Sequence, residues 1–193
     1  MNEISPNAKP AIARAPCRNQ SGQALVEFSL VMLLLVLLVF GLMDFCSAIY
    51  EKQLLVNLSR EGANLSARGV GGSQLGIMQN ALLAVQVEAQ PLNLSNSTSG
   101  RIILTALLNT NANSGYYVVS QQLESGSLSA TSLVGPNGVN HAATIPTNFI
   151  VGVNHTIYVA EVFYKFNVPA PLQKLIHVNV TNRFYDVAYF PGG

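Results

Sequence analysis

Few residues of this 193-residue chain have the types and spacing that catalysis or metal binding requires. Its three histidines, His141, His155 and His177, lie far apart and fit no metal-ligand spacing such as HExxH. Glu161 and Asp186 fall in predicted strands and could face one another, but isolated carboxylates on a solvated face are the ordinary case. The sequence therefore predicts no catalytic constellation, no metal site and no cofactor, and we expect a chain that is not an enzyme.

The charged residue in the most unusual setting is Glu27, near the start of a long apolar run. The sixteen residues from Phe28 to Met43 carry no charge, and Ala24 to Val26 extend the run backwards. About 20 apolar residues in a helix match the roughly 30 Å core of a bilayer. We predict one transmembrane helix over about residues 24–43. A carboxylate in mid-bilayer costs about 2.5–3.5 kcal/mol, so Glu27 needs a specific role.

A cleaved secretory signal is the main alternative interpretation of this run. Such signals have apolar regions of about 7–15 residues followed by a cleavage site between small residues. Cys46-Ser47-Ala48 resembles that site. However, the run is longer than a secretory signal needs, and helical periodicity continues beyond it. We therefore expect the run to be retained as an anchor.

Charges on the two sides of the run predict its orientation. Residues 1–22 contain three basic residues against Glu3, whereas residues 44–56 carry a net charge of −1. The positive-inside rule places the N-terminus in the cytoplasm and the remainder outside the membrane. The whole chain has a net charge of +1 and no tract rich in Lys and Arg, so nucleic acid is not an expected partner.

Motifs on both sides of the run resemble those of a known family. A polar leader ends at Gly22, and the stretch GQALVEF over residues 22–28 opens the apolar run. FGLMDF follows at residues 40–45, and SREGA at residues 59–63. Together these stretches resemble the TadE-like family, the pseudopilins of the tight-adherence (Flp pilus) system. The resemblance covers about residues 22–64.

This resemblance implies that a prepilin peptidase cuts between Gly22 and Gln23 on the cytoplasmic face and leaves the apolar helix in place. Glu27 would then lie four residues, about 6 Å of helix, from the new α-ammonium group of Gln23. We expect Glu27, with Phe28 beside it, to pair with the Gln23 amine of a neighbouring subunit and set the axial register. Gly41 is expected to allow close helix packing. The alternative is a Glu27 carboxylate that only reaches the cytoplasmic headgroups.

Beyond the membrane the pattern predicts two helices. The first continues the apolar helix to about Ala67, and the second runs from Gln74 to about Ala89, with Ser73 as its N-cap and Pro91 after its end. The apolar residues expected on the inner faces are Tyr50, Leu54, Leu58 and Leu65 in the first helix and Leu75, Met78, Leu82 and Val85 in the second.

The rest of the chain predicts a mainly antiparallel sheet, which makes the fold α+β and pilin-like. The expected strands are Arg101–Leu108, Tyr116–Leu123, Thr156–Val168 and Ile176–Phe190. Residues 124–155 have little periodicity and are expected to form a long loop with short extra strands. The side chains expected on the apolar faces are Tyr158, Ala160, Val162, Tyr164 and Phe166, then Val178, Val180 and Phe184.

We therefore expect three regions: a cleaved leader over residues 1–22, a long helix over 23–67 and a periplasmic head over 68–193. The favoured function is that of a minor pilin or pseudopilin of a bacterial tight-adherence apparatus. Its expected partners are the prepilin peptidase, other pilin or pseudopilin subunits and inner-membrane lipid.

Two other functions are considered. One is a stably anchored periplasmic binding module that recognises a ligand through the loop of residues 124–155. The other is a membrane-anchored hydrolase that uses Glu161, Asp186 or His177.

Overall fold

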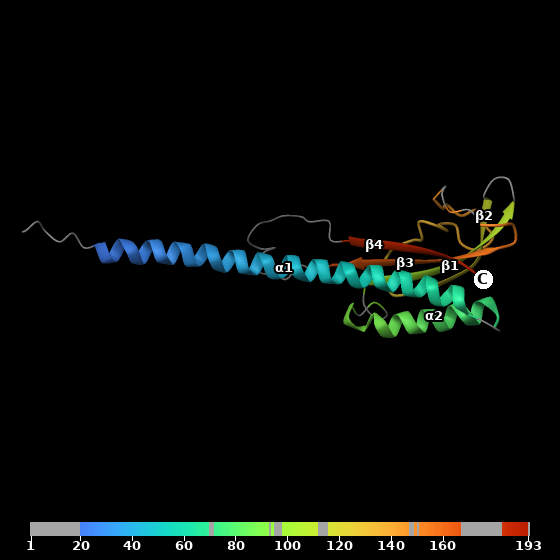
Figure 1. Ribbon diagram of the computed structural model, residues 1–193, viewed down its shortest axis with the longest axis horizontal. Helices are drawn as coiled ribbons and strands as arrows, with labels where there is room; N and C mark the ends of the chain where they lie inside the picture. Colours follow the sequence, from blue (N-terminus) through green and yellow to red (C-terminus); the bar gives the residue numbers. More distant parts are fainter. Residues whose placement is uncertain are drawn as a thin grey trace, which may run out of the picture. The chain divides into compact units, whose positions relative to one another are not determined.

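The computed structural model describes residues 20–69, 72–92, 94, 98–111, 116–146, 149, 151–166 and 183–192. The described chain forms two α-helices, a short 3-10 helix and four strands in that order. Figure 1 labels the α-helices and the strands. The elements are α1 (Gln20–Arg68), α2 (Gln74–Glu88), η1 (Gln90–Leu92), β1 (Gly100–Asn111), β2 (Tyr116–Ser125), β3 (Thr156–Lys165) and β4 (Arg183–Pro191). A long apolar helix, a short helix and a four-stranded antiparallel sheet confirm the predicted α+β layout.

The chain divides into two compact units, Met1–Gly41 and Leu42–Gly193. In its described part, the first unit is the beginning of α1, and every residue from 22 to 40 is exposed. The helix is long and apolar enough to cross a membrane. It begins at Gln20, before the expected start at residue 23, so the bond between Gly22 and Gln23 lies in its first turn.

The second unit is built on a sheet with the strand order β2-β1-β3-β4, in which all neighbours are antiparallel. The expected hairpin of the first two strands is confirmed, with both strands longer than predicted. β3 ends at Lys165, before the expected Val168. For the last strand the described part begins at Arg183, and Val178 and Val180 lie outside the described residues.

One face of the sheet is covered by the second part of α1 and by α2. All five residues predicted on the apolar face of β3 contact this core, which confirms the alternation: Tyr158, Ala160, Val162, Tyr164 and Phe166. Leu55, Leu58 and Ala63 of α1 are fully buried against them. α2 begins as predicted, because the Ser73 hydroxyl accepts a hydrogen bond from the Gly76 N–H at 3.2 Å.

Two residues predicted to face this core do not. Tyr50 is 60% exposed and Leu75 is 38% exposed. The buried face of α1 instead includes small residues, among them Ser59, Gly62, Ala63 and Ser66. Small side chains let a helix approach a sheet closely, so they are buried here although their hydrophobicity is low.

The other face of the sheet is covered by residues 126–155. Val134 packs there against Leu107, Ile157 and Val159, and partly buried residues of the same segment contact this second cluster. The described part of the segment contains no helix and no strand, and its pairing is limited to an isolated bridge between Val118 and Ala142. The predicted short extra strands are therefore reduced to this bridge. The sheet is buried on both sides, and β3 carries apolar residues on both.

Candidate functional site

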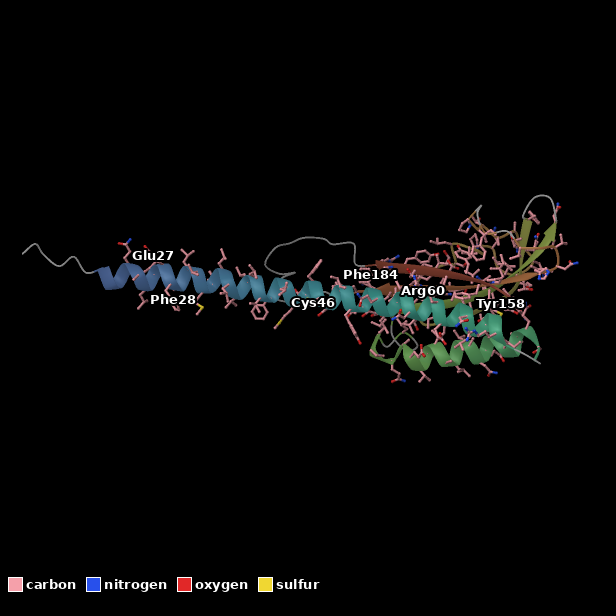
Figure 2. All side chains as sticks on the ribbon, in the orientation of Figure 1. Glu27, Phe28, Cys46, Arg60, Tyr158 and Phe184 are labelled. Carbon is pink, nitrogen blue, oxygen red and sulfur yellow. The ribbon has the colours of Figure 1, made fainter. Side chains whose placement is uncertain are left out.

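The residues of the expected processing signal lie together at the start of α1. Gly22, Gln23, Glu27 and Phe28 are all exposed. The Gln23 side-chain amide donates a hydrogen bond of 3.0 Å to the Glu27 carboxylate, one helical turn away. Figure 2 shows Glu27 and Phe28 on different sides of the helix. Cleavage after Gly22 would set free the backbone nitrogen of Gln23. The Glu27 carboxylate is thus already close to the residue that would carry the new amine.

Two glycines of α1 have opposite surroundings. A Cβ atom placed on Gly41 would meet nothing within 4 Å, so this position is open to an external partner. A Cβ atom on Gly62 would lie 3.2 Å from a methyl group of Val85 and 3.3 Å from side-chain atoms of Ala160 and Leu104. Gly62 therefore marks a point of close approach between α1, α2 and the sheet, a position that sequence reasoning assigned only to a family motif.

A polar cluster attaches the second part of α1 to the edge strand β4. The Lys52 ammonium group donates to the Tyr185 carbonyl at 2.8 Å and to the Asp186 carboxylate at 3.3 Å. The Ser59 hydroxyl donates to the other Asp186 oxygen at 2.5 Å. These side chains are seven residues apart on the helix, two turns, so one carboxylate fixes both the rotation and the height of α1 on the sheet.

Glu51 is a second carboxylate of α1 in a partly buried setting. Burial raises its pKa above the ordinary value of 4.5, and the hydrogen bond from Tyr164 opposes that shift. One of its carboxylate oxygens is buried without a hydrogen-bond partner among the described residues. The pKa of the Tyr164 hydroxyl is raised by burial and by the nearby Glu51 charge. Sequence reasoning missed this pair because it placed Tyr50, rather than the neighbouring Glu51, on the inner face of the helix.

Glu161 is the most deeply buried charged side chain among the described residues of the second unit, with no exposed surface. It is not on a solvated face as expected, because residues 126–155 cover it. Its carboxylate accepts hydrogen bonds from the Tyr185 hydroxyl at 3.0 Å, the Leu133 N–H at 2.8 Å and the Ser132 hydroxyl. Burial and this carboxylate raise the pKa of Tyr185 well above its usual range. Glu161 thus binds the covering segment to β3 and β4.

A cavity of about 580 Å³ lies beside these hydrogen bonds to Glu161, because Leu133 and Tyr185 also line it. Its floor contains Arg101, Phe163 and Tyr185, which are directly opposite one another across β1, β3 and β4. The Phe163 and Tyr185 rings are in contact, with centroids 4.8 Å apart. Leu128 and Leu133 of the covering segment form the apolar part of its wall.

The two candidate catalytic residues that the structure describes, Glu161 and Asp186, are not brought together. Glu161 is opposite Val187 and faces the covering segment, whereas Asp186 is opposite Val162 and faces the helices. His141 and His155 are exposed, and His177 lies outside the described residues. No group of three His, Cys, Asp or Glu side chains that could hold a metal occurs in the described part of the chain.

These features define an α+β protein with one helix able to anchor it in a membrane. Residues 22–64 match the family of TadE-like proteins, which confirms the resemblance noted in the sequence. The match spans both the exposed apolar part of α1 and the part that packs on the sheet, and it indicates a Tad pilus-related protein. No curated protein and no solved structure matches the chain.

Proposed function

We propose that this chain is a minor pilin or pseudopilin, a non-catalytic structural or assembly subunit of a bacterial tight-adherence pilus apparatus. A prepilin peptidase cuts it after Gly22, the apolar part of α1 holds it in the inner membrane, and the second unit lies in the periplasm. One observation carries the proposal. The TadE-like match begins at Gly22 and coincides with an apolar helix whose described residues are exposed on every side up to Phe40.

The exposed apolar surface of α1 needs a partner outside the chain, because such a surface is unstable in water. Lipid covers it before assembly, and the α1 helices of neighbouring subunits replace the lipid afterwards. The open space at Gly41 lets two helices approach closely. The Glu27 carboxylate then pairs with the Gln23 amine of a neighbouring subunit and fixes the register of the two helices.

The mature N-terminus tests the processing step. The full chain is expressed with and without its prepilin peptidase, and the N-terminus is identified by mass spectrometry. We expect a chain of 171 residues beginning at Gln23 when the peptidase is present, since 193 minus 22 is 171. Gly22→Leu should retain the leader, while Gly41→Leu, the same change in the same helix, should be cut normally. A leader retained with the active peptidase present would contradict the proposal.

The role of Glu27 is tested separately from cleavage. Glu27→Gln should leave the mature N-terminus unchanged and strongly reduce recovery of the subunit in cross-linked complexes with other pilins. Glu88→Gln is the matched control, because Glu88 is an exposed glutamate at the end of α2. Normal complexes with Glu27→Gln would overturn the pairing while leaving the processing result intact.

A second candidate function is a stably anchored periplasmic binding module. The cavity between β3, β4 and the segment of residues 126–155 favours it, because sites for small molecules are usually hollows of about 300–1,000 Å³. The same mass measurement separates the two functions. An anchored module keeps its leader, whereas the pilin subunit loses it.

A further inference from the structure

Arg183 lines the cavity above β3 and β4, and a second cation, Lys165, is its neighbour across the two strands. Lys165 and Arg183 are directly opposite each other on the two strands, and both are exposed. Like charges at directly opposed positions destabilise a sheet. Arg101, on the floor of the cavity, adds a third cation and is paired with Glu124. Arg183 forms no ion pair within the described part of the chain.

The described part of the chain offers no further anion for these cations. Asp186 is the nearest acidic residue in sequence, but it faces the helices and binds Lys52 and Ser59. Glu161 is fully buried, and its oxygens accept hydrogen bonds from the covering segment and Tyr185. The sequence between Lys165 and Arg183 contains no Asp or Glu. An anion from outside the chain would therefore remove an unfavourable charge arrangement.

The cavity is also held in shape before any ligand arrives. Glu161 fixes the floor through the Tyr185 hydroxyl and the wall through the Leu133 N–H. The Ser132 hydroxyl, which donates to Glu161, accepts the Gly135 N–H at 2.8 Å and so closes the turn of the wall. A fully buried carboxylate is costly to maintain, and a site whose walls are fixed in advance loses less entropy on binding.

We propose that this cavity binds an organic carboxylate with an apolar body. The carboxylate pairs with the Arg183 guanidinium group, whose planar donors suit that geometry. The apolar body lies on the Phe163 and Tyr185 rings and against Leu133. This site is independent of processing after Gly22, because every residue in it belongs to the second unit.

The test uses a fluorinated acid and its neutral counterpart. The full chain is placed in phosphatidylcholine nanodiscs, and binding of 4-(4-fluorophenyl)butanoate and of the corresponding amide is followed by ligand-observed fluorine NMR. Empty nanodiscs provide the blank. We expect the acid to bind roughly tenfold more tightly than the amide, the ratio that one charge-assisted hydrogen bond typically gives. Equal affinities, or no binding of the acid, would overturn the proposal.

Three variants locate the bound acid. Arg183→Gln should lower the affinity for the acid roughly tenfold and leave the affinity for the amide unchanged, since it removes the charge and keeps a polar side chain. Arg68→Gln, the same change at an exposed arginine ending α1, should alter neither. Leu133→Ser should lower the affinity for both the acid and the amide. Normal acid binding by Arg183→Gln would overturn the site.

Two further ligands are used as competitors: one tests the source of the carboxylate, and the other tests the need for an apolar body. If the natural ligand is a protein C-terminus, a tetrapeptide ending in a free phenylalanine carboxylate should displace the probe. If the tetrapeptide displaces the probe less well than the unlabelled free acid does, the natural ligand is a small molecule. Either result fits the proposed chemistry. Inorganic phosphate in tenfold excess should not displace the probe, and full displacement would overturn the requirement for an apolar body.

Discussion

The two parts of α1 carry similar residues but meet different surroundings. From Gly22 to Phe40 every residue is exposed, whereas Leu55, Leu58 and Ala63 are fully buried against α2 and the sheet. The second part therefore finds its partner within the chain. The first part remains exposed among the described residues, and the proposed function gives it lipid or another protein as its partner. Each part contains a leucine, a glycine, a polar contact and a glutamate that can be compared directly.

The leucines should show the largest contrast. Leu58→Ala should lower the free energy of unfolding of the second unit by about 2–5 kcal/mol, the usual cost of a cavity in a core. Leu35→Ala, in the exposed part, should leave that free energy unchanged. Hydrogen exchange of the β1 and β3 amides in the full chain measures both. Equal losses would mean that the two parts of the helix do not differ as described.

The glycines come next. Gly62→Leu should destabilise the second unit by about 1–3 kcal/mol, because its side chain would overpack against Val85, Leu104 and Ala160. Gly41→Leu meets no atom within the chain and should leave that unit as stable as before. Its effect should appear only in assembly, as reduced cross-linking between subunits. An unchanged exchange rate with Gly62→Leu would show that the contact can relax.

The polar contacts should differ less. Asp186→Asn should cost the second unit about 1 kcal/mol, because it weakens the bonds from Lys52 and Ser59 without removing the acceptor. Gln23→Ala removes the exposed contact with Glu27, which is worth at most about 0.5 kcal/mol to the helix. It should not change exchange in the sheet. A loss of stability with Asp186→Asn that exceeds the loss with Leu58→Ala would mean that the polar cluster, rather than the core, holds the helix on the sheet.

The glutamates should show the smallest contrast, and it should depend on pH. The pKa of Glu51 is raised by burial, so the folded state holds its proton more tightly than the unfolded chain does. Its stabilising contribution is complete below pH 4.5 and is lost as the pH rises through the folded pKa. Thermal unfolding should therefore show Glu51→Gln gaining stability over the natural chain between pH 4 and pH 7. Glu27→Gln should leave the stability of the second unit unchanged, because Glu27 belongs to the first unit.

The first part of α1 and most of the fold can be predicted from the sequence. The length of the apolar run suffices for the helix, and the alternation around Tyr158, Ala160 and Val162 suffices for β3. Ser73 marks the start of α2 correctly. In each case the signal is local, because a few neighbouring residues determine the period or the cap.

The rotation of α1 on the sheet is not predictable in the same way. Hydropathy correctly selects Leu54, Leu58 and Leu65, which contact the core, but it also selects the exposed Tyr50. It does not select Ser59, Gly62 and Ala63, which lie on the buried face. Small residues become core residues only when the opposite surface is present. Their role depends on tertiary structure and leaves no mark in the hydrophobic pattern.

The hydrogen bonds to the buried Glu161 and the cavity beside them are not predictable for another reason. Residues 126–155 have no periodicity, so nothing in them predicts that they cover a sheet face. Without that cover, Glu161 has the appearance of an ordinary solvated charge. Only the fold brings Ser132, Leu133 and Tyr185 to its carboxylate.

The start of α1 has a consequence for the mature protein that follows from the dipole of the helix. No acidic residue occupies its first turn. Cleavage after Gly22 would place a positive amine at the positive end of the dipole, where a cation costs about 0.3–1 kcal/mol. The new terminus would therefore fray when the subunit is alone, and a carboxylate from a neighbour would restore its first turn. Assembly would then complete the secondary structure of the helix as well as its packing.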